Sequence, residues 1–202
     1  MNNLYFKIIR LLVKNEYELK ARYLPALIFT LIFEVAIVSK YYPILGLGWL
    51  DLLKIPLVIF SALFIALLPK FCATTISGYI QTLYWDKFGN TTIKYIQKSK
   101  NKVYCNLLGI YDCEDKLISD MLKVTREDKL LFSKNVFYGF MRNFSFLIFI
   151  FFMINLYYFN YFIIENLLIL IFSFICLYIS SQRYAEQIIK SYIELRGRLL
   201  NE

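Results

Sequence analysis

The sequence predicts an all-α integral membrane protein with four transmembrane helices in two hairpins and a helical cytoplasmic insertion between them. Of the 202 residues, 59% are hydrophobic, above the roughly 45–50% apolar share of soluble domains. Four apolar segments approach the ~20 helical residues that cross a hydrocarbon core about 30 Å thick. Lys and Arg are concentrated in three of the five regions outside these segments, as expected for a multi-pass protein with one favoured orientation.

The four predicted spans cover about residues 23–42, 50–71, 143–158 and 161–181. A short connection joins the first span to the second, and another joins the third to the fourth, which predicts two antiparallel hairpins. The expected organisation is an amphipathic N-terminal helix at 1–22, hairpin one at 23–71, a cytoplasmic helical region at 72–142, hairpin two at 143–181 and a cytoplasmic C-terminal helix at 182–202.

The placement of basic residues predicts the orientation. Residues 1–22 hold five Lys and Arg, the segment 70–142 holds twelve, and the tail after Ser181 holds four. The turn at 41–54 holds one, and the turn near Asn160 holds none. Because cytoplasmic loops carry the excess of Lys and Arg, both termini and the insertion are expected in the cytoplasm, with the protein in the bacterial inner (cytoplasmic) membrane.

The insertion of about seventy residues is too long for a simple loop. Its sequence predicts a turn at Gly89 and Asn90, followed later by two helices. Thr125 and Asp128 are expected to cap the second of these helices, which has no breaker before Gly139 and should run directly into the third span. After the fourth span, apolar residues keep a helical spacing that predicts continuation into the cytoplasm: Tyr184, Ile188, Tyr192, Leu195 and Leu199.

The residue types present limit the catalytic and metal-binding sites that the chain could form. The chain has no His, which removes the commonest general base and metal ligand. Its four Cys show no C-x-x-C spacing, and no Gly-rich phosphate loop is present. We therefore expect no cofactor, no metal site and no enzymatic activity. The sequence also lacks the paired-carboxylate or nucleophile motif that a lipid-modifying membrane enzyme would need.

Two polar residues inside predicted spans are candidates for gating or lining a pore. Glu34 lies mid-span, where an ionisable group costs at least about 2.5 kcal/mol. It is either a neutral side chain hydrogen-bonded to a neighbouring helix or a pore residue. Asn155 has the same alternatives, a contact between helices or a pore position.

A lysine cluster follows the predicted turn: Lys94, Lys98, Lys100 and Lys102. Such a cluster is either a solvated face near anionic lipid or a binding site for an anionic or nucleic-acid ligand. Further along, the stretch FSKNVFYGFMRNF enters the third span. On a helix Asn135, Tyr138 and Arg142 share one face through i, i+3, i+7 spacing. With Asn143 they are candidates for a site at the cytoplasmic mouth, where Arg142 can reach a phosphate.

Two segments, WDKFGNTTIKYI and TREDKLLFSKNVFYGFMRN, resemble a bacterial family of small membrane proteins with W-G-G-x-P-T-T and Y-G-F-R-R-N motifs. The first motif is matched by Trp85, Thr91 and Thr92, and the second by Asn135, Tyr138, Gly139, Phe140, Arg142 and Asn143. The departures are Asp86 and Lys87 in place of glycines, Asn90 in place of Pro, and Met141 in place of the first Arg. The shared layout covers roughly residues 20–195.

The family resembles the transmembrane effectors of antiphage defence, and among them the Hailong type. That resemblance implies a homo-oligomeric effector in membrane lipid that forms a pore or disrupts the membrane potential. It also implies an oligonucleotide ligand, made by a partner nucleotidyltransferase, that holds the effector inactive. The basic residues Lys94, Lys98, Lys100, Lys102 and Arg142 would contact this ligand. The alternative function is an accessory or structural subunit of a transporter or secretion assembly.

Overall fold

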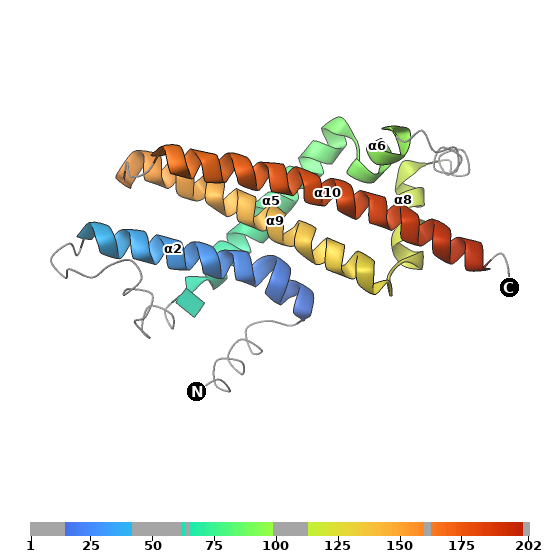
Figure 1. Cartoon of the computed structure of the whole chain (residues 1–202), viewed down its shortest axis with the longest axis horizontal. Helices are drawn as coiled ribbons and strands as arrows, with labels where there is room; N and C mark the ends of the chain where they lie inside the picture. The colour runs from blue at the N-terminus through green and yellow to red at the C-terminus, as the bar shows by residue number, and fades with distance from the viewer. Residues whose placement is uncertain (1–14, 42–61, 64, 99–112, 160–162, 200–202) are drawn as a thin grey trace. The chain divides into compact units, whose positions relative to one another are not determined.

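The computed structural model describes residues 15–41, 62–63, 65–98, 113–159 and 163–199, and within these ranges it contains helices and no strand (Figure 1). The elements are η1 (Glu18–Tyr23), α2 (Leu24–Tyr41), α5 (Leu67–Phe88), α6 (Thr91–Lys98), α8 (Glu114–Val124), α9 (Lys129–Ile154), η3 (Asn155–Phe159) and α10 (Ile163–Leu199). The all-α prediction is confirmed for this part of the chain. Lys100 and Lys102 lie outside the described residues.

Among the residues that the structure describes, two helical segments are long and apolar enough to cross a membrane, Lys129–Tyr158 and Ile163–Arg196. They contain the third and fourth predicted spans. The predicted first span is helical through η1 and α2, whereas most of the second lies outside the described residues. Two expectations of continuity are confirmed, since α9 runs without a break from the insertion into the third span and α10 extends to Leu199.

The chain divides into two compact units. The first combines residues 1–78 with 139–176, and the second combines 79–138 with 177–202. The divisions fall within α5, α9 and α10, so each of these helices contributes residues to both units.

The first unit packs around small and apolar side chains. Its buried cluster comprises Tyr23, Ala26, Leu63, Ala66, Ala73 and Leu147. Three of the six are alanines, which let helix backbones approach closely where no large side chain separates them. The Tyr23 hydroxyl donates a hydrogen bond to the Leu63 carbonyl, and the Ser145 Oγ on α9 donates to the Ser173 carbonyl on α10 at 3.0 Å.

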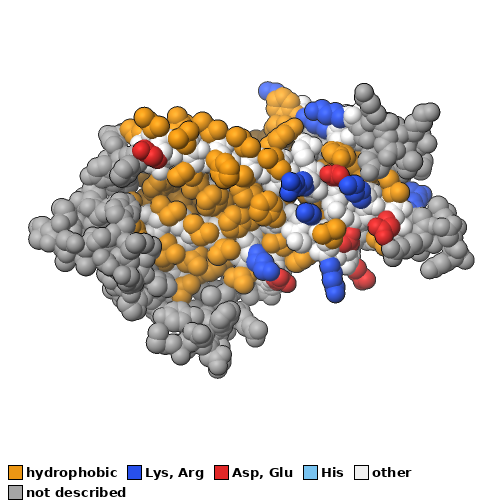
Figure 2. All heavy atoms as spheres, in the orientation of Figure 1, with side chains coloured by type: hydrophobic (Ala, Val, Ile, Leu, Met, Phe, Trp, Pro, Cys, Tyr) orange, Lys and Arg blue, Asp and Glu red, His pale blue; other side chains and the backbone are white. Residues whose placement is uncertain are grey.

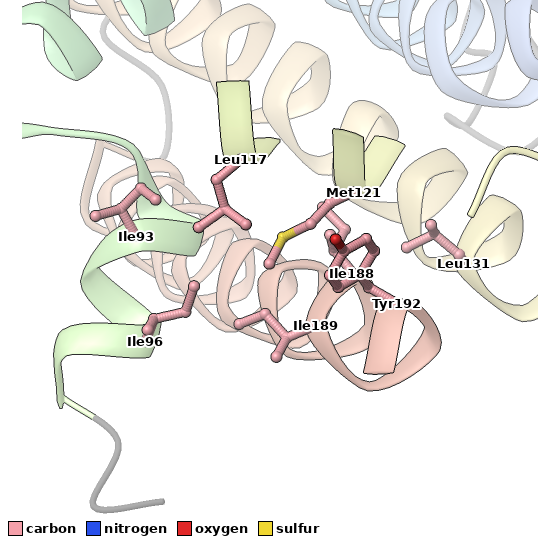
Figure 3. Packing of buried hydrophobic residues seen from close by; sticks show 8 residues of the cluster. All are labelled: Ile93, Ile96, Leu117, Met121, Leu131, Ile188, Ile189 and Tyr192. Carbon is pink, nitrogen blue, oxygen red and sulfur yellow. The ribbon is translucent and has the colours of Figure 1, made fainter. Parts of the chain in front are cut away.

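The second unit has a conventional apolar core (Figure 3). Four helices contribute to it: Ile93 and Ile96 from α6, Leu117 and Met121 from α8, Leu131 from α9, and Ile188, Ile189 and Tyr192 from α10. The predicted face of the C-terminal helix is thus buried within this chain at Ile188 and Tyr192. The predicted turn is also confirmed, because Gly89 has a φ of 80° and Asn90 Oδ1 accepts the Thr92 N–H at 2.8 Å.

The start of α9 differs from the predicted capping. The Thr125 hydroxyl donates to the Met121 carbonyl at 2.7 Å and so belongs to the end of α8. Asp128 alone caps α9, accepting the N–H groups of Leu130 at 2.7 Å and Leu131 at 3.1 Å. Ser191 of α10 also donates to this carboxylate. The Ser191 hydrogen bond, with the two backbone donors, lowers the pKa of Asp128 against the opposing effect of burial.

Candidate functional site

A proline opens the helix at the start of the first predicted span. Pro25 has no N–H, so it cannot donate to the carbonyl of Ala21 four residues earlier, and its ring crowds that carbonyl. The residues just before it form η1, the wide π-type turn, in which the Leu24 N–H bonds to Leu19 O instead of to the residue four back. The consequence is a buried backbone carbonyl, at Ala21, that lacks its ordinary α-helical donor.

Asn143 of α9 supplies the missing donor. Its Nδ2 donates to the Ala21 carbonyl at 2.7 Å, and its Oδ1 accepts from the Ser77 Oγ of α5 at 2.9 Å. Asn143 is 0% exposed and Ser77 is 5% exposed, so both bonds are shielded from water. We call Ala21, Ser77 and Asn143 the polar node. It joins η1, α5 and α9 through one amide side chain.

Gly139 brings η1 against α9 one helical turn before Asn143. A Cβ at this position would lie 2.7 Å from the Tyr17 Oη and 3.0 Å from the Ala21 Cβ. Both distances are too short for an ordinary contact, so a larger residue would require the Tyr17 ring to move and Ala21 to shift by a few tenths of an ångström. The glycine of the Y-G-F motif therefore favours the close helix packing that lets Asn143 reach Ala21.

Charged residues surround the polar node on η1 and α5. The Lys70 Nζ lies 2.7 Å from the Glu18 Oε1, with both side chains less than one-fifth exposed. The Arg22 guanidinium lies over the Tyr17 ring at 5.6 Å. The ion pair joins η1 to α5, whereas the Arg22–Tyr17 contact joins η1 to its own N-cap residue.

The side chains of the polar node hold helices together through hydrogen bonds. Ser77 and Asn143 both use their polar atoms in structural hydrogen bonds. No group of His, Cys, Asp and Glu that could hold a metal ion occurs among the described residues. The polar node is thus a mechanical connection between three helices.

The other candidate gating residues lie at different places. Glu34 is half-buried on α2, and Asn155 is 2% exposed at the start of η3. Asn135 and Tyr138 belong to the second unit, where the Tyr138 ring stacks on Tyr184 with centroids 5.6 Å apart. Among these candidates Asn143 belongs to the polar node, and Gly139 lies one helical turn before it.

The predicted ligand contacts are described only in part. Lys94 and Lys98 lie one turn apart on α6 in the second unit, whereas Arg142 belongs to the first. The Lys94 Nζ lies over the rings of Tyr84 at 5.3 Å and Phe88 at 5.6 Å. This ammonium group is already engaged by aromatic side chains of its own unit.

The threonine motif has a structural role at the α5–α6 turn. Thr92 is 5% exposed and donates its N–H to Asn90, whereas Thr91 accepts a hydrogen bond from the Ser181 hydroxyl at 3.4 Å. The carbonyl of Trp85 accepts the Gly89 N–H at 2.7 Å. The Thr92 and Trp85 bonds lie within the α5–α6 turn, whereas the Thr91 bond joins the start of α6 to α10.

Sequence reasoning missed four residues of the site, Tyr17, Ala21, Pro25 and Ser77. One signal was available, because a proline inside a helix frees the carbonyl four residues earlier and calls for an outside donor. Nothing in the sequence identifies which side chain provides that donor.

Comparison with known proteins found no matching family model, no matching curated protein and no matching solved structure.

Proposed function

We propose that the protein is a homo-oligomeric effector of the bacterial inner membrane, with four spans in two hairpins, that dissipates the membrane potential during antiphage defence. A nucleotide or oligonucleotide ligand on the basic cytoplasmic part holds it inactive. The resemblance of the WDKFGNTT and NVFYGFMRN segments to defence effectors supports this role. The candidate ligand contacts are Lys94, Lys98, Lys100, Lys102 and Arg142, and the Lys94 ammonium also lies over the rings of Tyr84 and Phe88.

The observation that carries the proposal is the exposed apolar surface of α10. Between residues 163 and 175 only Leu170 and Ser173 are buried. Side chains are exposed all around the helix, among them Ile164 at 72%, Leu168 at 61% and Phe172 at 66%. In Figure 2 hydrophobic side chains gather over the helices of the first unit. Such a surface in water would be a strong aggregation hazard, whereas lipid or further copies of α10 would cover it.

The exposed helix also favours assembly. Only 17% of the most apolar window of Ile163–Arg196 is buried within one chain, against 39% for Lys129–Tyr158. Four spans enclose little aqueous space, so a conducting path would require several copies arranged around a common axis. The polar node provides a connection through which a cytoplasmic change at the start of η1 or in α9 reaches the spans.

Expression of the chain alone in bacteria tests the proposal. We expect growth arrest and loss of membrane potential, because the ligand-producing partner is absent. The purified protein should be a stable homo-oligomer in mild detergent. Unchanged growth and potential at normal membrane insertion would contradict the effector role, and a monomer stable only with another protein would favour an accessory subunit.

A further inference from the structure

The C-terminal half of α5, within the second unit, leaves a broad apolar face uncovered. Its exposed side chains are Tyr79 at 65%, Ile80 at 50%, Leu83 at 49%, Tyr84 at 50% and Phe88 at 50%. At 3.6 residues per turn these five positions occupy one side of the helix. The opposite side carries Gln81, Thr82 and Trp85. This half of α5 is therefore amphipathic, with its apolar side outward.

Two lysines are placed on the same face. Lys87 lies between Leu83 and Phe88 on the helical wheel, and its Nζ is 5.5 Å from the Phe88 ring centroid. The turn at Gly89 reverses the chain and brings the Lys94 Nζ over Tyr84 and Phe88. The face therefore combines exposed aromatic rings with ammonium groups. We call Tyr79, Ile80, Leu83, Tyr84, Lys87, Phe88 and Lys94 the aromatic-lysine face.

We propose that the aromatic-lysine face lies in the headgroup region of the inner leaflet and binds anionic lipid, an inference that rests on the membrane location proposed above. Tyr side chains with an apolar ring and a polar tip favour this interface. Lysines bury their methylene stems beside apolar groups while the ammonium reaches phosphate. For Lys94 this assigns the lipid headgroup as partner in place of a soluble nucleotide.

Charge complementarity favours lipid over a second copy of the chain. In a two-fold contact between identical faces, Lys87 and Lys94 would meet the same lysines of the other copy without an acidic group on the face to neutralise them. The nearest acid along the helix, Asp86, lies at the edge of the face beside Tyr79 and points about 100° away from Lys87. A phosphate-rich interface provides the negative charge and also accepts the exposed rings.

Spin labels on neighbouring positions of α5 provide the test. Cys72, Cys105, Cys113 and Cys176 would first be replaced by Ser, and single cysteines introduced by Ile80→Cys or by Thr82→Cys. These two positions point about 160° apart on a helix, and both are exposed. A third label, at Phe172→Cys on α10, monitors insertion of the span. The full chain is reconstituted in nanodiscs with phosphatidylglycerol, and collisions of each label with oxygen and a water-soluble nickel chelate are measured.

We expect the Ile80 label to collide mainly with oxygen and the Thr82 label mainly with the nickel chelate. Adding Lys87→Gln and Lys94→Gln should raise nickel collisions at Ile80 at least twofold in phosphatidylglycerol and leave them unchanged in phosphatidylcholine. A lipid-exposed Phe172 label together with a water-exposed Ile80 label would overturn the lipid-binding inference and would still support the membrane location. An Ile80 label shielded from both reagents would also overturn it, since a protein would then cover the face. A water-exposed Phe172 label would instead contradict the membrane location itself.

Discussion

The polar node predicts that the importance of Asn143 depends on Pro25. Asn143→Ala removes the side chain that donates a hydrogen bond to the Ala21 carbonyl. In the natural sequence that carbonyl lacks an α-helical donor because residue 25 is Pro. Pro25→Ala restores a backbone N–H at this position. The same Asn143→Ala substitution should therefore be less costly in the Pro25→Ala background.

The hydrogen bonds at the node set the expected magnitude. Leaving the buried Ala21 carbonyl without a donor costs about 1–3 kcal/mol. Losing the 2.9 Å bond from Ser77 adds about 0.6 kcal/mol, a typical value for a side-chain hydrogen bond within a membrane protein. Asn143→Ala should thus lower the free energy of unfolding by about 2–4 kcal/mol. With Ala at position 25 the loss should be smaller by about 1–3 kcal/mol, while the volume lost at Asn143 is the same in both backgrounds.

A double-mutant cycle measures this coupling. The natural protein, Asn143→Ala, Pro25→Ala and the double variant are unfolded with SDS in mixed micelles, and unfolding is followed by circular dichroism. Ser145→Ala serves as the matched control, because Ser145 is 0% exposed and bonds a carbonyl on α10. Its effect should add to that of Pro25→Ala within about 0.5 kcal/mol. An equal cost of Asn143→Ala in both backgrounds would refute the role assigned to the proline-freed carbonyl.

Three further predictions test the packing and the electrostatics. Gly139→Ala should lower the free energy of unfolding by about 1–3 kcal/mol through overpacking, offset by about 1 kcal/mol from the higher helix propensity of Ala. In the same SDS titration, adding Tyr17→Phe should recover part of the lost stability. The pKa of Asp128 is lowered in the folded protein, so the stability that this carboxylate contributes is present above its unfolded pKa and is lost as the pH falls through its folded pKa. Asp128→Asn should therefore reduce the fall in thermal midpoint that occurs below about pH 4. An unchanged fall would contradict the lowered pKa. Met121→Ala, at 0% exposure, should cost about 2–5 kcal/mol, and Leu122→Ala, at 43% exposure, less than about 1 kcal/mol; equal costs in SDS unfolding would contradict the described core.

Local patterns were sufficient for much of the helical structure. The turn at Gly89 and Asn90 follows from residue types that favour turns, and the continuity of α9 follows from the absence of a breaker. The buried face of α10 was visible in the spacing of Ile188 and Tyr192, because a 3.6-residue period depends only on neighbouring positions. The predicted four-span topology stays a prediction beyond the two helices with suitable length and composition.

The candidate site depends on contacts that the sequence does not encode locally. Ser77 and Asn143 are 66 residues apart, and Asn143 and Ala21 are 122 residues apart. No periodicity relates such positions, so only the folded chain reveals the node. Thr125 shows a second limit, since its hydroxyl can cap a following helix or bond the carbonyl four residues earlier. Tertiary packing of Asp128 against Ser191 decides between these alternatives.

The most direct test of the proposed function is the membrane potential of liposomes that contain the purified chain. Vesicles with phosphatidylglycerol carry a potassium gradient, valinomycin sets the potential, and a voltage-sensitive dye reports it. We expect the ligand-free protein to collapse the potential. The rate of collapse should rise more than linearly with the protein density in the vesicle, because several copies form one conducting path. Vesicles in which the oligomer is inserted but the potential persists at every protein density would contradict the proposal.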